Sequence, residues 1–131
     1  MSEVVAEETE KFISEQQHKD NLSSQLATSP EILEQLRGYG IAEDRLVRLE
    51  YFFYTNTVEK AGALSSELSD MGYNTEVEDS SGSQKKVRVV AGSTAPIQMA
   101  TEKVLEWTEA MCNAGYKHDC EFDGWGISPE Q

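Results

Sequence analysis

The strongest constraint on the fold is the order in which two apolar periodicities follow one another in the later part of the chain. Residues 48–55 alternate between two faces and include four consecutive aromatic residues, which is typical of a central strand. Residues 58–71 carry apolar side chains three or four positions apart, which predicts an amphipathic helix. The two patterns then recur. They predict strands at 73–79, 85–91 and 118–123, and a helix that opens at Gly92–Pro96 and ends at Gly115.

The order strand, helix, strand, strand, helix, strand predicts an α+β fold of the ferredoxin-like βαββαβ type. Such a fold has a four-stranded antiparallel sheet with two helices on one face. The sheet face opposite the two helices must be exposed to solvent or covered by another segment, and we expect residues 1–40 to cover it. One aromatic pair, either Tyr51 and Phe53 or Phe52 and Tyr54, points away from the two helices, and we expect it to be buried beneath that cover.

The N-terminal residues differ in composition from the rest. Residues 1–28 are rich in Glu, Gln, Ser and Lys, and their sparse apolar residues predict a polar arm that is helical or partly disordered. Ser29 as an N-cap and Pro30 at the first helical position then predict a helix start. Asn56 is expected to cap the following helix. Residues 29–131 are expected to form a single α+β domain.

The net charge of the chain indicates which kind of molecule it can bind. The 131 residues include 24 Asp and Glu against 11 Lys and Arg, a net charge of −13. Such a surface repels phosphate backbones, and the densest basic stretch is only Lys85, Lys86 and Arg88. Exposed aromatic residues on a sheet can stack RNA bases, but the glycine-aromatic signature of that module is absent and the charge has the wrong sign. We therefore expect a basic protein partner and no direct contact with nucleic acid.

The cellular location of the protein and the redox state of its cysteines are predicted from the absence of membrane-spanning and secretory patterns. No apolar stretch approaches the roughly 20 residues that a membrane-spanning helix needs, and the N-terminus has no secretory signal pattern. Cys112 and Cys120 are expected to be free, buried thiols. These features predict a cytoplasmic protein without membrane contact, and they leave the oligomeric state open.

Candidate catalytic groups are few. The two histidines, His18 and His118, have no neighbours at the spacing of a zinc site. His118 and Cys120 share one side of a predicted strand but would lie about 7 Å apart, too far for a hydrogen bond. Gly92–Thr94 could bind an anion through free backbone N–H groups, although helix capping is the favoured interpretation. No metal or cofactor is expected. The alternative is a small-ligand- or metal-dependent enzyme on the same scaffold.

The most specific segment is Glu121-Phe122-Asp123-Gly124-Trp125-Gly126. Its two glycines on either side of a tryptophan allow a tight backbone path that packs or presents the large ring. In the predicted strand, Asp119, Glu121 and Asp123 share one side. They could act as acid/base groups or bind a hard cation, but a solvated edge that faces a partner is favoured.

This ending resembles that of the regulator of ribonuclease E activity B family. Earlier segments are similar to the family's order: Ile32–Arg37 before a glycine loop, Leu49–Tyr54, and Leu68–Tyr73 at a helix end. The resemblance covers roughly residues 29–127. It implies a small acidic protein with a ferredoxin-like fold, non-catalytic, that binds a ribonuclease E-like endoribonuclease and inhibits it.

On this resemblance, Asp119, Glu121, Asp123 and Trp125 are expected to contact the partner. The tryptophan would be an anchor and the acids its charged rim. A second interpretation stays open, in which Trp125 and Phe122 only close the core and Asp123 only caps a turn.

Overall fold

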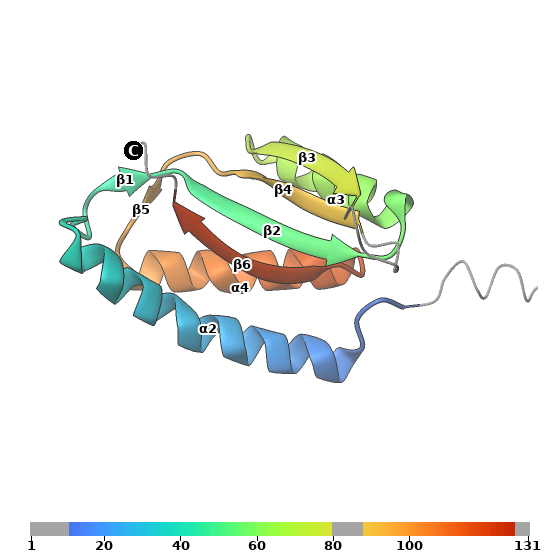
Figure 1. Ribbon diagram of the computed structural model, residues 1–131, viewed down its shortest axis with the longest axis horizontal. Helices are drawn as coiled ribbons and strands as arrows, with labels where there is room; N and C mark the ends of the chain where they lie inside the picture. The colour runs from blue at the N-terminus through green and yellow to red at the C-terminus, as the bar shows by residue number, and fades with distance from the viewer. Residues whose placement is uncertain (1–10, 80–87, 128–131) are drawn as a thin grey trace, which may run out of the picture.

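The computed structural model describes residues 11–79 and 88–127 (Figure 1). Its elements are helix α2 (Glu15–Gly38), strands β1 (Leu46–Val47) and β2 (Leu49–Thr55), helix α3 (Val58–Asp70), strands β3 (Asn74–Asp79), β4 (Arg88–Ser93) and β5 (Ile97–Gln98), helix α4 (Thr101–Lys117) and strand β6 (Glu121–Ile127). Within these residues, no helix is long and apolar enough to cross a membrane. The segment Ser80-Ser81-Gly82-Ser83, whose turn-forming residues predict a hairpin between β3 and β4, lies outside the described residues.

The strands form antiparallel sheets, so the predicted mixture of helices with antiparallel strands is confirmed. The larger sheet has four strands in the order β3-β4-β2-β6. The smaller sheet pairs β1 with β5, and the pattern of the sequence does not predict this pair. Residues 97 and 98 were assigned to the last helix, and that assignment is wrong because they pair with β1 before α4 begins.

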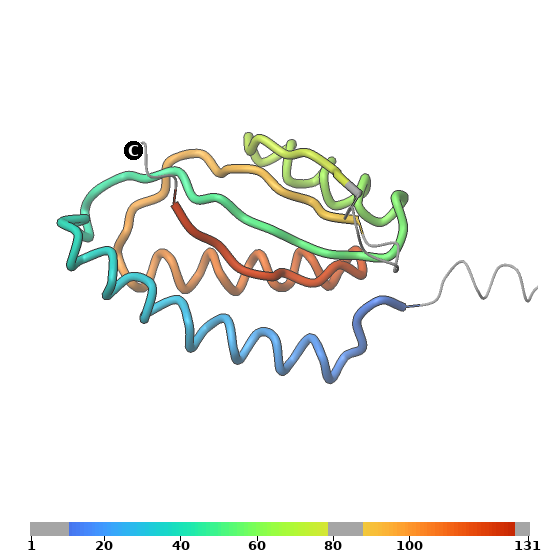
Figure 2. Tube along the Cα trace, viewed as in Figure 1, coloured from blue at the N-terminus to red at the C-terminus, as the bar shows by residue number. Residues whose placement is uncertain are grey.

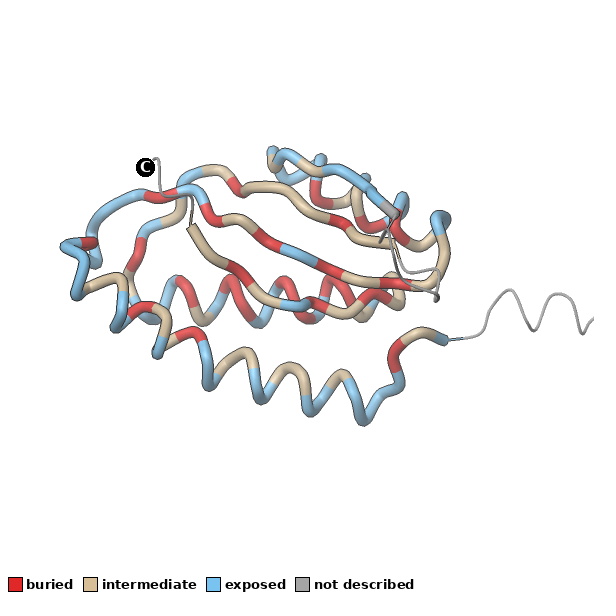
Figure 3. The backbone as a smooth tube through the Cα atoms, in the orientation of Figure 1, coloured by how far each residue is buried: buried red, intermediate tan, exposed pale blue. Residues whose placement is uncertain are grey.

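One face of β2 forms the centre of the core. Leu49, Tyr51 and Phe53 are fully buried, whereas Phe52 is 40% exposed. Figure 3 shows the alternation of burial along β2. Phe53 packs on Phe122 of β6 with ring centroids 5.1 Å apart. Full burial of each large apolar side chain stabilises the fold by about 1.5–3 kcal/mol. The predicted alternation along this strand is confirmed, and it directs the odd-numbered side chains toward α3 and α4.

The N-terminal helix is longer than predicted. It begins after Ser14, whose hydroxyl and the Gln17 side chain form a reciprocal capping box. It continues through Pro30, so the predicted helix start at Ser29 is wrong, and the predicted division after residue 28 falls within a continuous helix. Ser29 is buried, and its hydroxyl lies 2.9 Å from that of Thr108 in α4. Packing against α4 thus favours an unbroken helix, although proline removes one backbone hydrogen bond.

Helix α2 does not cover the second face of the sheet, contrary to prediction. It runs beside α4 and the edge of β6 (Figure 2), where Asn21 Nδ2 donates to the backbone oxygen of Phe122 at 2.9 Å. Leu33 of this helix is part of the buried core. The sheet face that looks toward the viewer in Figure 1 is therefore not crossed by any described helix. Phe52 and Tyr54 lie on that face instead of beneath a cover.

Two predicted helix ends also differ from the structure. Thr57, one residue beyond the predicted Asn56, caps α3, and its hydroxyl accepts from Lys60 N. Helix α4 continues past Gly115 to Lys117. A Cβ atom at Gly115 would lie 2.8 Å from the backbone oxygen of Cys120, so this glycine serves close packing and not helix termination.

The segment predicted to open the last helix belongs to the sheet. Gly92 and Ser93 are the final residues of β4. Thr94 is buried, and its hydroxyl accepts from the backbone N–H of Leu49 at 3.0 Å. The segment therefore neither caps a helix nor presents backbone N–H groups at a helix start, and α4 begins later, after Ala100.

Candidate partner-binding surface

The turn that joins α4 to β6 separates Asp119 from the other predicted site residues. Strand β6 begins at Glu121, so the prediction that Asp119 shares a strand face with Glu121 and Asp123 is wrong. Asp119 has a positive φ of 59°. Its N–H donates to Tyr116 O, and the N–H of Cys120 donates to Gly115 O. These two hydrogen bonds form a Schellman motif in which Asp119 occupies the position usually taken by glycine.

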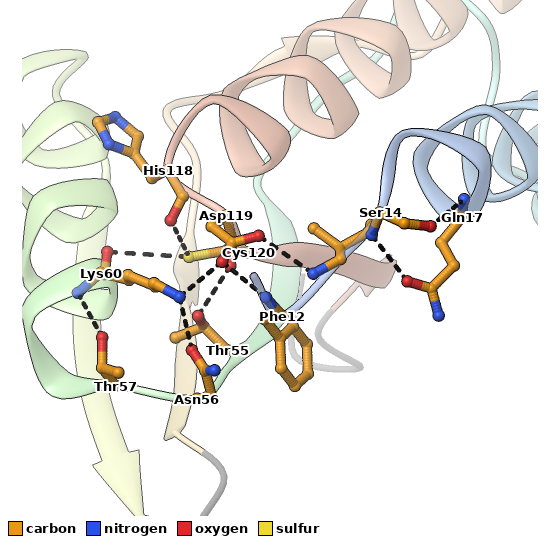
Figure 4. A network of polar contacts seen from close by, with 11 residues as sticks. Phe12, Ser14, Gln17, Thr55, Asn56, Thr57, Lys60, His118, Asp119 and Cys120 are labelled. Atoms are coloured by element: carbon orange, nitrogen blue, oxygen red, sulfur yellow. Dashed lines mark hydrogen bonds and ion pairs between the residues drawn. The ribbon is translucent and has the colours of Figure 1, made fainter. Parts of the chain in front are cut away.

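The Asp119 carboxylate is held by the protein itself (Figure 4). Lys60 Nζ lies 2.6 Å from one oxygen, which also accepts from Phe12 N at 2.7 Å, and Ile13 N donates to the other at 3.1 Å. Burial alone would raise the pKa of this carboxyl, but the contacts with Lys60, Phe12 and Ile13 together hold the pKa below its usual value. Asp119 therefore attaches the start of the described chain to the domain.

Trp125 is also used within the protein. It is only 8% exposed, and its indole N–H donates to the Ser29 hydroxyl at 2.8 Å. Its ring meets that of Trp107 edge to face, with centroids 6.1 Å apart. Trp125 thus closes the core between α2 and α4, which is the second interpretation that the sequence left open for this residue.

A β-bulge in β6 explains why Phe122 and Trp125, which are three positions apart, both face the core. Phe52 pairs with Gly124 and Phe53 pairs with Phe122, so Asp123 is one extra residue in β6. Gly124 has a φ of 144°, which residues with a side chain rarely adopt. As a result, Phe122 and Trp125 both point into the core although they are three positions apart, and Asp123 is exposed.

The other two predicted acids, Glu121 and Asp123, lie on the side of the sheet that no described helix covers, here called the open face. In the observed register, its side chains are Glu50, Phe52 and Tyr54 of β2, Val89, Ala91 and Ser93 of β4, Asn74, Glu76 and Glu78 of β3, and Glu121 and Asp123 of β6. Each of the strands except β4 contributes at least one carboxylate to it. None of these carboxylates forms an ion pair with a cation among the described residues.

Like charges interact at the β6 edge of the open face. The pKa of Tyr54 is raised, first by the negative charge of Asp123, then by burial and by a hydrogen bond to the same carboxylate. The pKa of Glu121 is raised by burial and by the charge of Asp123. A positive group placed here would lower the pKa of Glu121, so this edge favours a cationic partner.

The thiol-imidazole pair considered from the sequence is not formed. His118 Nε2 lies 2.8 Å from Glu67 Oε1, while the Cys120 thiol faces the backbone oxygens of Lys60 and His118. Burial raises the pKa of Cys120 to about 11, which keeps it a neutral thiol. Among the described residues, no three His, Cys, Asp or Glu side chains gather in a way that could hold a metal ion.

Sequence reasoning located part of this surface. It singled out Glu121 and Asp123, which lie on the open face, together with Asp119 and Trp125, which do not. It missed Glu50 and Glu76, because their proximity depends on the strand order. The usable signal was the alternation itself, because Glu50 shares its side of β2 with Phe52 and lies between two buried residues, and Glu76 and Glu78 share one side of β3.

Comparison with known proteins gives a family for most of the chain. The model of the family described as regulator of ribonuclease activity B matches residues 27–127. The match includes every strand of the open face and about half of α2. A search of curated proteins found no match.

Proposed function

Because the chain belongs to the regulator of ribonuclease activity B family, we propose that it is a non-catalytic regulator that binds and inhibits a ribonuclease E-like endoribonuclease. Such a protein would change RNA turnover by protein–protein contact, without touching RNA. We also propose a cytoplasmic location, which is supported by the two free cysteines.

The observation that carries the proposal is the acidic open face. The sheet presents carboxylates around the exposed Phe52 ring, on a chain with a net charge of −13. A face of this kind attracts a lysine- and arginine-rich protein segment and accelerates its association. An endoribonuclease needs basic segments to hold its RNA substrate. Occupying such a segment would lower its activity.

Within this proposal, Glu121 and Asp123 contact the partner directly. Asp119 and Trp125 act indirectly, since the first anchors the N-terminal segment and the second packs beneath β6. We further propose that the larger sheet with α3 and α4 is a ferredoxin-like unit. The support is the strand order β3-β4-β2-β6, and the β1–β5 pair is then an addition to that unit.

The experiment is a binding and inhibition assay with the purified ribonuclease E-like enzyme of the same organism. Cleavage of a labelled transcript should slow as the protein is added, and the affinity should fall steeply as the salt concentration rises. The variant Glu121→Gln/Asp123→Asn should bind about tenfold more weakly, because it removes two charges from the open face. The matched control is Glu34→Gln/Glu106→Gln, which removes two charges from α2 and α4, outside the open face.

Two outcomes would overturn the proposal. One is the absence of binding and inhibition at every salt concentration. The other is an equal loss of affinity in the control variant and the open-face variant, which would mean that total charge matters and the open face does not. The proposal is supported if Glu34→Gln/Glu106→Gln inhibits the enzyme fully and Glu121→Gln/Asp123→Asn inhibits it only weakly.

A further inference from the structure

The open face contains a hollow of about 350 Å³ between β2, β4 and β3. Its side chains come from two rows across the sheet. Glu50, Ser93 and Asn74 form one row, and Phe52, Ala91 and Glu76 form the other. The hollow exists because β4 contributes the small residues of each row, while its neighbours contribute the large ones.

The dimensions of the hollow follow from the strand spacing. Neighbouring strands lie about 4.8 Å apart, so β2 and β3 are separated by about 9.6 Å across β4. A flat group can enter this width above Ala91, with the Phe52 ring on one side and the Glu76 carboxylate on the other. Phe52 lines the hollow and is 40% exposed as a residue.

The chemistry of the lining is that of a cation site. Glu50 and Glu76 supply two carboxylates, and no described residue that lines the hollow is basic. Asn74 Nδ2 donates to Ser93 Oγ at 3.3 Å, which leaves the Asn74 side-chain oxygen as a further acceptor. An aromatic face beside carboxylates suits a guanidinium better than an ammonium, because guanidinium stacks on rings and forms several directed hydrogen bonds.

We propose that this hollow receives an arginine side chain of the partner protein, stacked on Phe52 and hydrogen-bonded to Glu50 and Glu76. The inference rests on the proposed function for the identity of the partner, and it deepens that function by naming the residue type recognised. Single-stranded RNA is the competing occupant for an exposed aromatic residue on a sheet, but the two carboxylates repel its phosphates.

The test uses the whole protein and small probes, so that it does not depend on the ribonuclease. In ¹⁵N NMR titrations, N-acetyl-arginine methylamide should shift the amide signals of Ala91, Gly92 and Ser93 with millimolar affinity. N-acetyl-lysine methylamide at the same concentration should bind at least about fivefold more weakly, since an ammonium lacks the planar stack. Equal shifts with both probes, no shift with either, or stronger shifts with a uridine oligonucleotide would each overturn the proposal.

Variants then locate the site. Glu50→Gln/Glu76→Gln should weaken arginine binding by about tenfold or more. The matched control is Glu34→Gln/Glu106→Gln, which removes two exposed acids from α2 and α4, outside the open face, and should bind arginine as the natural protein does. Phe52→Leu, which keeps an apolar side chain, should remove most of the preference for arginine over lysine. Unchanged preference in Phe52→Leu would contradict the stacking arrangement.

The two proposals can fail separately. If the arginine probe binds in the hollow and no ribonuclease is bound or inhibited, the proposed function falls and the arginine site stands. If the ribonuclease is inhibited through Glu121 and Asp123 while Glu50→Gln/Glu76→Gln has no effect on either ligand, the arginine site falls and the function stands.

Discussion

Replacing Asp119 with asparagine should release the N-terminal segment from the end of the sheet and destabilise the protein. The carboxylate accepts hydrogen bonds from two backbone amides and pairs with Lys60 at 2.6 Å, and the Lys60 and Asp119 side chains are only 17% and 15% exposed. Asparagine tolerates the left-handed backbone conformation at this position, as aspartate does. The substitution therefore removes the charge without adding backbone strain.

The size of the effect follows from the hydrogen bonds that asparagine cannot form. A hydrogen bond to a charged group contributes about 1.5–3 kcal/mol, and asparagine keeps one acceptor oxygen for a backbone amide. Lys60 also keeps its hydrogen bond to Asn56 Oδ1 at 2.9 Å. We therefore expect the free energy of unfolding to fall by about 2–3 kcal/mol at pH 7, which corresponds to a Tm lowered by about 6–12 °C for a chain of this size.

The effect should depend on pH in a defined direction. The pKa of Asp119 in the folded protein lies below its usual value of 3.8, so the folded state favours the ionised form. The stabilisation is complete well above the unfolded pKa and disappears as pH falls through the folded pKa. The difference in stability between the natural protein and the Asp119→Asn variant should thus be full at pH 7 and shrink below about pH 4.

The assay is urea unfolding followed by tryptophan fluorescence, since Trp107 and Trp125 are both buried. Hydrogen exchange of the Phe12 and Ile13 amides provides a local readout, because these amides should lose protection in the variant. Asp123→Asn is the control, and as an exposed change it should alter stability by less than about 0.5 kcal/mol. Equal stability of the Asp119→Asn variant and the natural protein at pH 7, or a difference that persists unchanged at pH 2, would refute the reasoning.

Other substitutions and reagents test the remaining packing. Gly92→Ala should separate β3 from β4 at one end, because its Cβ would clash with the backbone oxygen of Asn74; faster amide exchange in β3 is the measurement, and unchanged exchange contradicts it. Trp125→Phe should cost about 1–2 kcal/mol in urea unfolding, since it removes the hydrogen bond to an α2 serine hydroxyl; a neutral effect contradicts this. Cys112 and Cys120, with pKa values raised to about 12 and about 11 by burial, should resist a thiol reagent at pH 8 until urea unfolds the protein; rapid labelling of the folded protein would show that they are accessible.

Periodicity in the sequence predicted the elements that pack against one another. The strand at 48–55 and the helix at 58–71 were located to within a residue or two, because alternating or helical burial leaves a direct trace in the order of apolar residues. Helix starts and ends that were predicted from glycine or proline were less accurate. Pro30 lies within a continuous helix, and Gly115 allows close contact with Phe53 instead of ending α4.

The candidate surface could be predicted only in part for a related reason. Glu121 and Asp123 are close in sequence, so their joint exposure could be inferred from one strand. Glu50 and Glu76 line the same hollow from strands on either side of β4, and the periodicity of the sequence does not give the register that places them there. The role of Asp119 was also inaccessible, since its contacts with Phe12 and Ile13 span 107 and 106 positions.

The bulge in β6 has a consequence for how this strand can vary in length. Asp123 is the unpaired extra residue, so its deletion would restore regular alternation and leave Phe122 and Trp125 on the same inward side. A one-residue deletion usually reverses every side chain beyond it, but here it would remove only a surface acid. Related sequences with one residue fewer between these two rings would therefore keep the tertiary structure and lack the carboxylate that acts on Tyr54. The acidic surface and the aromatic core can thus change independently at this position.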